Sequence, residues 1–431
     1  MSTLLFENVL GLFETPEGGY TLRDASVYIA DGKIVGIDRA PAGFAPDRRI
    51  DGRGKLLMPG LVNSHTHIPM TILRNAADDL KFHEWLFGRI MPLEDKLTPE
   101  DAYWGTQLGL MEMLRTGTTC FLDMYIFTDA IAQAICDAGG RAVLSRGIID
   151  SDGGGKQRLR EAVEEIERWQ GRENLSFMLA PHAPYTCTPA YQREVAQTAR
   201  KLGVGIHTHI SESAREVEES VAKYGKRPPA ILEETGLLTP YTVAAHCVYL
   251  DEADIEILVR TGTHVAHNPV SNLKLANGIA PVPELYAAGI NVTLGTDGAA
   301  SNNTLNLFRD LGFAALLHKG VSGDPQAVPA AAGLKMALTN GARALGLEGK
   351  VGKLAEGYAA DLTLIDLSHP NLRPLNDPLT ALAYSASGHE VELTMVSGRI
   401  LYENGAYPTI DAVRVIHEVE RTCGRIGLRG T

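Results

Sequence analysis

Short apolar runs alternate with helical patterns through the central three hundred residues of the chain. The helical stretches, such as DAYWGTQLGLMEMLRTG and KQRLREAVEEIERWQGR, repeat their apolar positions every three to four residues. The apolar runs between them are LMPGLVN, TTCFLDM, RAVLSRGI, LSFMLAP, VGIHTHI, TVAAHC, THVAHNP and NVTLGTD. Eight strand-helix units of this kind predict a metal-dependent (β/α)₈ TIM barrel over residues 59–353. An open doubly wound sheet is the alternative, but the Gly-rich phosphate loop typical of its first strand is missing here.

Both ends of the chain show a different pattern. Residues 1–58 hold short alternating segments separated by Gly and Pro, which predict hairpin strands of a small antiparallel sheet. After GKVGKLAEGYAADLTLID, short strands resume and residues 410–429 follow as an amphipathic closing helix. We therefore expect residues 1–58 and 354–431 to form together one small β-sandwich domain beside the barrel.

Polar residues gather where the eight predicted strands end. Six of the thirteen histidines lie at these ends. Active sites of (β/α)₈ barrels are built at the carboxyl ends of the strands. In chain order these ends give His65 and His67, Asp123, Arg146, His182, His209 with Glu212, His246, His267 and Asp297. This alignment predicts one site at that end of the barrel.

The site has the residue types of a metal centre. His65 and His67 are two apart in an extended segment and therefore share a face. With His209 and Asp297 they form a three-histidine, one-carboxylate set that suits a divalent ion such as Zn²⁺, which would lower the pKa of a bound water toward about 7.

Glu212 and His246 are the candidates for the proton transfers at this site. Glu212 follows His209 by three residues, although it could also be the cap of the next helix. His246 could be catalytic or structural, and His267 could support the site or brace a loop. Asp123 is expected to accept an internal hydrogen bond. The charged runs REAVEEIERW and REVEES are interpreted as solvated helix faces.

Charge and composition exclude several classes of protein. The net charge of −12 over 431 residues argues against a nucleic-acid or anionic-membrane partner. No apolar run reaches membrane-spanning length, and the first residues lack the basic segment of a signal peptide. The five cysteines are scattered without a CxxC pair, as in reduced proteins. We therefore expect a cytoplasmic protein that acts on a small molecule.

The motifs PGLVNSHTH, HTHISE, HCVYL, HNPVSNLKL and GTDGAASNN resemble those of the amidohydrolase superfamily. Within it, LKFHEWLFGRIMPLEDKLT, APHAPYT and two arginines resemble the 5′-methylthioadenosine/S-adenosylhomocysteine deaminases. This resemblance implies hydrolytic removal of the adenine amino group from an adenosine analogue. It also implies one divalent metal per subunit, with zinc favoured over iron or manganese. The bridging lysine of two-metal relatives is missing from APHAPYT.

The resemblance also implies roles for individual residues. It assigns His65, His67, His209 and Asp297 to the metal, and Glu212, His246 and Asp297 to catalysis. Among the substrate contacts, Glu94 would accept from the ribose hydroxyls and His182 would contact the nucleoside, together with Glu212. Arg146 and Arg158 would reach the 5′ substituent, Arg146 across a subunit interface of a homodimer or homotetramer, while Trp85 and Ser301 would line the pocket. Arg160 is an alternative to Arg158.

Other functions stay open at this point. Methylthioadenosine, S-adenosylhomocysteine, adenosine and 5′-deoxyadenosine are not ranked by the sequence. A sister aminohydrolase or chlorohydrolase acting on guanine, cytosine, 8-oxoguanine or a triazine would share every metal ligand. Glu94, Arg146 and Arg158 distinguish a nucleoside deaminase from these sister enzymes, because a free base carries no ribose. A non-catalytic metal-binding scaffold is the remaining alternative, and its expected sign is loss of a ligand or of Glu212.

Overall fold

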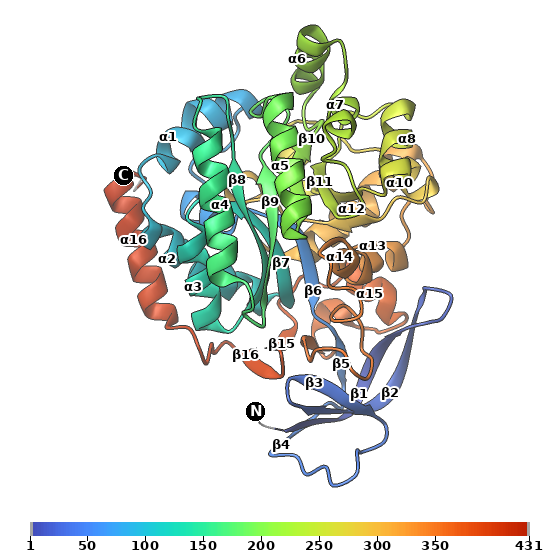
Figure 1. The fold of residues 1–431 in the computed structure, drawn as a ribbon. Helices are drawn as coiled ribbons and strands as arrows, with labels where there is room; N and C mark the ends of the chain where they lie inside the picture. Colours follow the sequence, from blue (N-terminus) through green and yellow to red (C-terminus); the bar gives the residue numbers. More distant parts are fainter. Residues whose placement is uncertain (1–2, 429–431) are drawn as a thin grey trace.

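Two sheets organise the computed structural model, which describes residues 3–428 (Figure 1). The larger sheet is the predicted barrel, and all of its neighbouring strands pair in parallel. Its strands follow the chain in order: β6 (Leu61–Thr66), β7 (Thr118–Tyr125), β8 (Arg141–Ile148), β9 (Leu175–Pro181), β10 (Gly205–Ile210), β11 (Thr242–His246), β12 (His264–His267) and β13 (Val292–Leu294). Each coincides with one of the eight apolar runs, so the predicted (β/α)₈ fold is confirmed.

The barrel closes where the last strand meets the first. The backbone N–H of Asp297 donates to the carbonyl of His65 at 3.0 Å. Gly295 permits this approach, because a Cβ at that position would lie 2.4 Å from Asn268 Oδ1 and 2.8 Å from His65 Cβ. Closure therefore brings the HxH segment of β6 next to the aspartate that follows β13.

Helices cover the outside of the barrel (Figure 1). Local sequence sets their ends: Thr98 with Asp101 and Asp251 with Asp254 form capping boxes, and glycines in the left-handed region end several helices. The helices between residues 68 and 261 are η1 (Ile68–Leu73), the π-helix η2 (Glu84–Ile90), α1 (Met91–Glu94), α2 (Pro99–Arg115), α3 (Thr128–Ala138), α4 (Gly155–Trp169), α5 (Pro189–Leu202), α6 (Ala214–Tyr224), α7 (Pro228–Thr235) and α8 (Glu252–Thr261). They are followed by α9 (Pro269–Lys274), α10 (Val282–Ala287), α11 (Ala299–Asn302), α12 (Leu307–Ser322), α13 (Ala330–Ala337), α14 (Thr339–Ala344), η3 (Pro370–Leu372), α15 (Pro378–Tyr384) and α16 (Ala412–Ile426). None of the helices within residues 3–428 is long and apolar enough to cross a membrane.

The two chain ends build the second sheet, as predicted. Its strands are β1 (Leu4–Glu14), β2 (Tyr20–Ala30), β3 (Lys33–Ile37), β4 (Arg48–Asp51), β5 (Lys55–Pro59), β14 (Leu362–Asp366), β15 (Val391–Val396) and β16 (Arg399–Glu403). They are ordered β16-β15-β14-β5-β1-β2-β3, with β4 also paired to β1. The expectation of a purely antiparallel sheet is wrong, because β4 and β5 both run parallel to β1. After β3 the chain crosses back to the start of β1, so β4 and β5 are reached by a crossover connection and not by hairpin turns.

The last two helices do not stay with this sheet. α15 packs on α12 and α13, and α16 packs along α2 of the barrel (Figure 1). Val415, Val419 and Ile426 give α16 its buried face, and the Thr422 hydroxyl donates to Asp101 Oδ1 at 2.6 Å. The C-terminal part therefore contributes to both the sheet and the outer layer of the barrel.

A buried ion pair joins the small sheet to the barrel. Arg141, at the start of β8, donates to both carboxylate oxygens of Asp361 at 2.6 and 3.2 Å and to the Ser397 hydroxyl at 2.7 Å. Both charged side chains are almost fully buried. This joint lies at the amino ends of the barrel strands, which leaves the carboxyl ends free to carry a site.

Candidate functional site

Four predicted metal ligands converge at the carboxyl ends of β6, β10 and β13. His65 Nε2 lies 3.4 Å and His67 Nε2 lies 3.3 Å from Asp297 Oδ1. One ligand atom each from His65, His67 and Asp297, and separately from His65, His209 and His246, lie within 4.8 Å of one another. The described residues therefore form a histidine-rich cluster that can hold a metal ion.

Hydrogen bonds fix the orientation of each histidine in this cluster. His209 Nδ1 donates to the His182 carbonyl at 2.7 Å, and His67 Nδ1 donates to the Met124 carbonyl. His65 Nδ1 contacts His207 Nε2 at 2.8 Å. With their Nδ1 atoms engaged, all three rings present Nε2 to the same point. His65 Nε2 is buried and has no hydrogen-bond partner within residues 3–428, which is the pattern expected of a nitrogen that binds a metal.

Asp297 is held by a set of short hydrogen bonds. Its Oδ2 accepts from Ser271 Oγ at 2.6 Å and from Ser301 Oγ at 2.8 Å, while Oδ1 accepts from the Gly298 N–H at 2.7 Å. Burial alone would raise the pKa of this carboxyl, but His65 and His67 beside it hold the pKa well below its usual range. Asp297 is therefore an anion that points Oδ1 at the histidines.

Glu212 and His246 face each other beside the cluster. Glu212 Oε1 accepts from Asn277 Nδ2 at 3.0 Å and lies 3.9 Å from His246 Nε2. His246 Nδ1 donates to Asn272 Oδ1 at 2.8 Å, which leaves Nε2 as the free ring nitrogen. Burial raises the pKa of Glu212 well above its usual value. Glu212 is therefore equipped to hold a proton at neutral pH.

Glu216 supports this arrangement from the following helix. Its carboxylate accepts from the backbone N–H groups of Ser211 and Glu212, each at 2.8 Å. Burial raises its pKa to about 7. The interpretation of REVEES as a solvated face is therefore wrong at Glu216, which α6 turns inward in its first turn.

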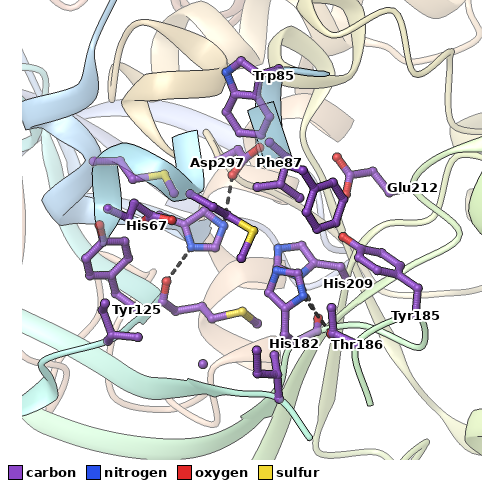
Figure 2. A pocket seen from close by; sticks show the side chains of 18 of the residues that line it. His67, Trp85, Phe87, Tyr125, His182, Tyr185, Thr186, His209, Glu212 and Asp297 are labelled. Atoms are coloured by element: carbon purple, nitrogen blue, oxygen red, sulfur yellow. Dashed lines mark hydrogen bonds and ion pairs between the residues drawn. The ribbon is translucent and has the colours of Figure 1, made fainter. Parts of the chain in front are cut away.

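A cavity of about 360 Å³ opens onto the cluster. Figure 2 shows side chains that line it. Trp85 and Phe87, from the π-helix η2, form one wall, and Tyr125, His182 and Tyr185 lie around the rest. Its polar lining residues include His67, Glu94, Arg158, His182, His209, Glu212, His246 and Asp297. Most of the residues predicted for the site therefore lie around one cavity.

Glu94 stands apart from the metal cluster but lines the same cavity. Burial raises its pKa to about 7, and the Tyr125 hydroxyl partly offsets that rise. Tyr125 itself was missed by the sequence analysis, although it ends β7 two residues after Asp123. Asp123 accepts from the Ile68 N–H at 2.6 Å, which is the internal role that was expected.

Two predicted substrate contacts lie elsewhere. Arg146 does not line the cavity, because its guanidinium contacts Glu161 and Glu165 of α4 at 2.6 Å each. Side chains alternate along β8, and since the Ser145 hydroxyl reaches His207 inside the barrel, its neighbour Arg146 points outward. Its proposed role across a subunit interface stays a prediction.

Ser301 also needs correction. It is buried behind Asp297, to which its hydroxyl donates, and it is not part of the cavity wall. Arg158, in contrast, lines the cavity and Arg160 does not, which favours Arg158 of the two. His267 contacts His318, with 3.3 Å between their Nε2 atoms, and lies outside the cavity.

His207 is a second residue at the site that sequence reasoning overlooked. It lies two residues before His209 on β10, in the same HxH spacing that drew attention to His65 and His67. Its Nδ1–H donates to the Ser145 hydroxyl oxygen at 3.0 Å, because the Ser145 proton is used on the Asp123 carbonyl, and its Nε2 contacts His65 Nδ1. The repeated HxH spacing was the signal that could have found it.

Comparison with known proteins gives consistent matches. The model of the amidohydrolase family matches residues 56–401. A 5-methylthioadenosine/S-adenosylhomocysteine deaminase of Moorella thermoacetica is 48% identical over 383 residues, which cover 88% of this chain and 90% of the relative. One from Caldanaerobacter subterraneus subsp. tengcongensis is 44% identical over 422 residues, covering 97% of each chain.

Solved structures agree with these matches. A zinc-bound adenosine deaminase from Xanthomonas campestris superposes with a TM-score of 0.94 at 37% identity and covers 99% of both chains. The atrazine chlorohydrolase of Arthrobacter aurescens TC1, complexed with zinc, gives 0.90 at 26% identity and covers 97% of this chain and 99% of its own.

Proposed function

The chain belongs to the amidohydrolase family, and we propose that it hydrolytically deaminates the adenine ring of adenosine analogues. The substrates proposed are 5′-methylthioadenosine and S-adenosylhomocysteine, with adenosine and 5′-deoxyadenosine as further candidates, and the products are the inosine analogue and ammonia. One observation carries the proposal: Glu94 lines the same cavity as the histidine–aspartate cluster. A carboxylate can accept from two neighbouring hydroxyls, so this cavity suits a base joined to a ribose.

We propose one zinc ion per chain at the cluster. Support comes from the clustering of the histidine and aspartate ligand atoms, from the buried and unpartnered His65 Nε2 among the described residues, and from the zinc in the two related structures. His65, His67, His209 and Asp297 would hold the ion. When bound, zinc supplies a Lewis acid that makes a water molecule a nucleophile near neutral pH.

The remaining residues account for the proton transfers. Glu212, whose pKa is raised by burial, donates a proton to N1 of the adenine as C6 becomes tetrahedral. His246 Nε2 hydrogen-bonds the new oxygen on C6, and Asp297 accepts a proton from the attacking water. Asp297 passes this proton to the amino group, which leaves as ammonia. The remaining hydroxyl proton returns to Glu212 as C6=O forms, so the reaction consumes one water and releases one ammonia.

A sister activity on a free base or triazine is the second candidate, favoured by the likeness to the chlorohydrolase. It differs in what it demands of Glu94, because a free base or triazine offers no ribose hydroxyls. The rest of the cluster serves either substrate class equally.

An ammonia-release screen tests the proposal. The purified protein is offered methylthioadenosine, S-adenosylhomocysteine, adenosine, adenine, guanine, cytosine and a chlorotriazine, before and after metal removal and zinc addition. We expect release from the nucleosides only, and loss and recovery of activity with zinc near one equivalent per chain. Ammonia release from a free base alone, or chloride release from the chlorotriazine alone, would contradict the nucleoside assignment. Self-association as a dimer or tetramer and a cytoplasmic location stay predictions of the sequence.

A further inference from the structure

The open end of the cavity differs from its metal end in charge. Lining residues that also reach solvent mark this open end: Phe87 and Met91 are exposed by 40% and 37%, and the Arg158 side chain is exposed by 30%. Asp95 is exposed beside them. Arg158 is the one arginine or lysine among the described residues that line the cavity. Any attraction of the open end for an anion therefore depends on Arg158.

The guanidinium of Arg158 is already occupied. Its Nη1 and Nη2 donate to Asp152 Oδ1 and Oδ2, at 2.6 Å each, and Nη1 also donates to the Ile149 carbonyl at 3.0 Å. This is a bidentate arginine–carboxylate pair, in which both charges are compensated. Three of the five N–H groups of the guanidinium are used in this way.

Asp152 is fixed in this position by its own loop. Its Oδ1 accepts from the Gly154 N–H at 3.0 Å, and Gly153 between them adopts a positive φ of 82°. The Arg158 guanidinium beside it holds the pKa of Asp152 well below its usual range. Asp152 does not itself line the cavity, so it acts on a ligand through Arg158.

We propose that Asp152 determines specificity at the 5′ end of the substrate by cancelling the charge of Arg158. The cavity then favours adenosine analogues whose 5′ substituent is neutral, such as a methylthio group, over those with an anionic one. Asp95 at the same rim acts in the same direction. This inference rests on the proposed deaminase function, because it assumes that the base lies at the metal end.

Among the described residues of this chain, no second arginine or lysine lines the cavity to take over the role of Arg158. Arg146 is held outside the barrel wall by Glu161 and Glu165. A carboxylate can still use the free Nε–H and the second Nη2–H of Arg158, but it meets a neutral ion pair and not an open positive charge. The choice between neutral and anionic substituents is thus set by one carboxylate.

The test compares kcat/KM of wild type and Asp152→Asn for methylthioadenosine and adenosine-5′-carboxylate. Asparagine keeps an oxygen for the Gly154 N–H and removes the charge. We expect kcat/KM for the carboxylate substrate to rise at least about fivefold. In the variant, the substrate carboxylate accepts its hydrogen bond from an Arg158 guanidinium whose charge is no longer neutralised, at a partly exposed site. The value for methylthioadenosine should stay within about twofold, which also shows that the variant is folded.

Two further variants isolate the cause. Glu167→Gln removes one negative charge from an exposed position of the same helix, α4, and should change neither substrate. Arg158→Met combined with Asp152→Asn should abolish most of the gain, because the released guanidinium is its source. An unchanged or lower value for the carboxylate substrate in Asp152→Asn would overturn the inference, as would an equal gain in the double variant. If the wild-type protein deaminates no nucleoside at all, the proposed function itself is wrong. This outcome is distinct from a failure of the inference about Asp152.

Discussion

The two ends of the cavity are built in different ways. At the metal end, His65, His209 and Asp297 are buried, come from rigid strand ends, and each has a hydrogen-bond partner that fixes its direction. At the open end, η2 and α1 supply the exposed apolar side chains of Phe87 and Met91. Arg158 of α4 and Asp152 of the preceding loop supply one partly exposed ion pair. The metal end is fixed by partners behind its ligands, whereas the open end is shaped by surface residues.

This difference indicates how function is divided along the cavity. Chemistry needs atoms held within fractions of an ångström, which buried hydrogen-bond networks provide. Selection among 5′ substituents needs only charge and polarity, which surface residues can change at little cost in stability. Substitutions should therefore produce smaller effects, and effects more confined to KM, as they move from the metal end to the open end.

Glu212→Gln should have the largest effect. It keeps the shape of the side chain and removes the proton donor, and such losses reduce kcat by about 10²–10⁴-fold. Metal content should remain that of wild type, because Glu212 is not a proposed ligand. Glu218→Gln, on the exposed side of α6, is the matched control in the same kinetic assay. Nearly full kcat in Glu212→Gln would show that the proton comes from another group.

His207→Asn tests the support behind the ligands. His207 contacts His65 Nδ1, and removing such a partner reduces metal affinity by about 10–100-fold. Competition with a chelator of known zinc affinity measures the change. His417→Asn, at an exposed position of α16, is the control. An unchanged metal affinity in His207→Asn would mean that the ligands do not depend on the hydrogen bond between His207 and His65.

Much of this division could be predicted from the sequence. The eight apolar runs were enough to place every barrel strand, and the polar residues at their ends were enough to indicate the ligand set, because a parallel barrel brings all these ends together. The pattern could not show that β4 and β5 run parallel to β1, since strand direction depends on the crossover and not on alternation.

The structure places some individual residues differently from the sequence pattern, and the causes are physical. Arg146 was treated as a strand end, yet β8 continues to Ile148 and the alternation of side chains turns Arg146 outward. Ser301 lies near Asp297 in sequence, but the turn of α11 places it behind the carboxylate. Glu216 belongs to a charged run, and only the contact with the Ser211 and Glu212 N–H groups distinguishes it from its solvated neighbours.

Glu94, between the two ends, should give an intermediate effect that depends on pH. Burial raises its pKa to about 7, so the carboxylate form that accepts both ribose hydroxyls becomes dominant as pH rises through this value. If only that form binds well, KM for methylthioadenosine should fall by about tenfold from pH 6 to pH 8. Glu94→Gln should have a high KM with no such dependence. A pH-independent KM in wild type would contradict the role of Glu94.

Tyr125→Phe should have the smallest effect, and one that reports on Glu94 alone. The Tyr125 hydroxyl lowers the pKa of Glu94, so its removal should raise that pKa further and move the midpoint of the KM profile to higher pH. A midpoint shift of about 0.3 to 0.5 pH units should raise KM at pH 7 by about 1.5- to 2-fold, while KM at pH 9 matches wild type. Tyr185→Phe removes a phenol hydroxyl from the wall beside Glu212 and should leave the KM midpoint unchanged (Figure 2). A uniform rise of KM at every pH in Tyr125→Phe would mean that the hydroxyl binds substrate directly, and the boundary between the two ends of the cavity would then lie at Tyr125.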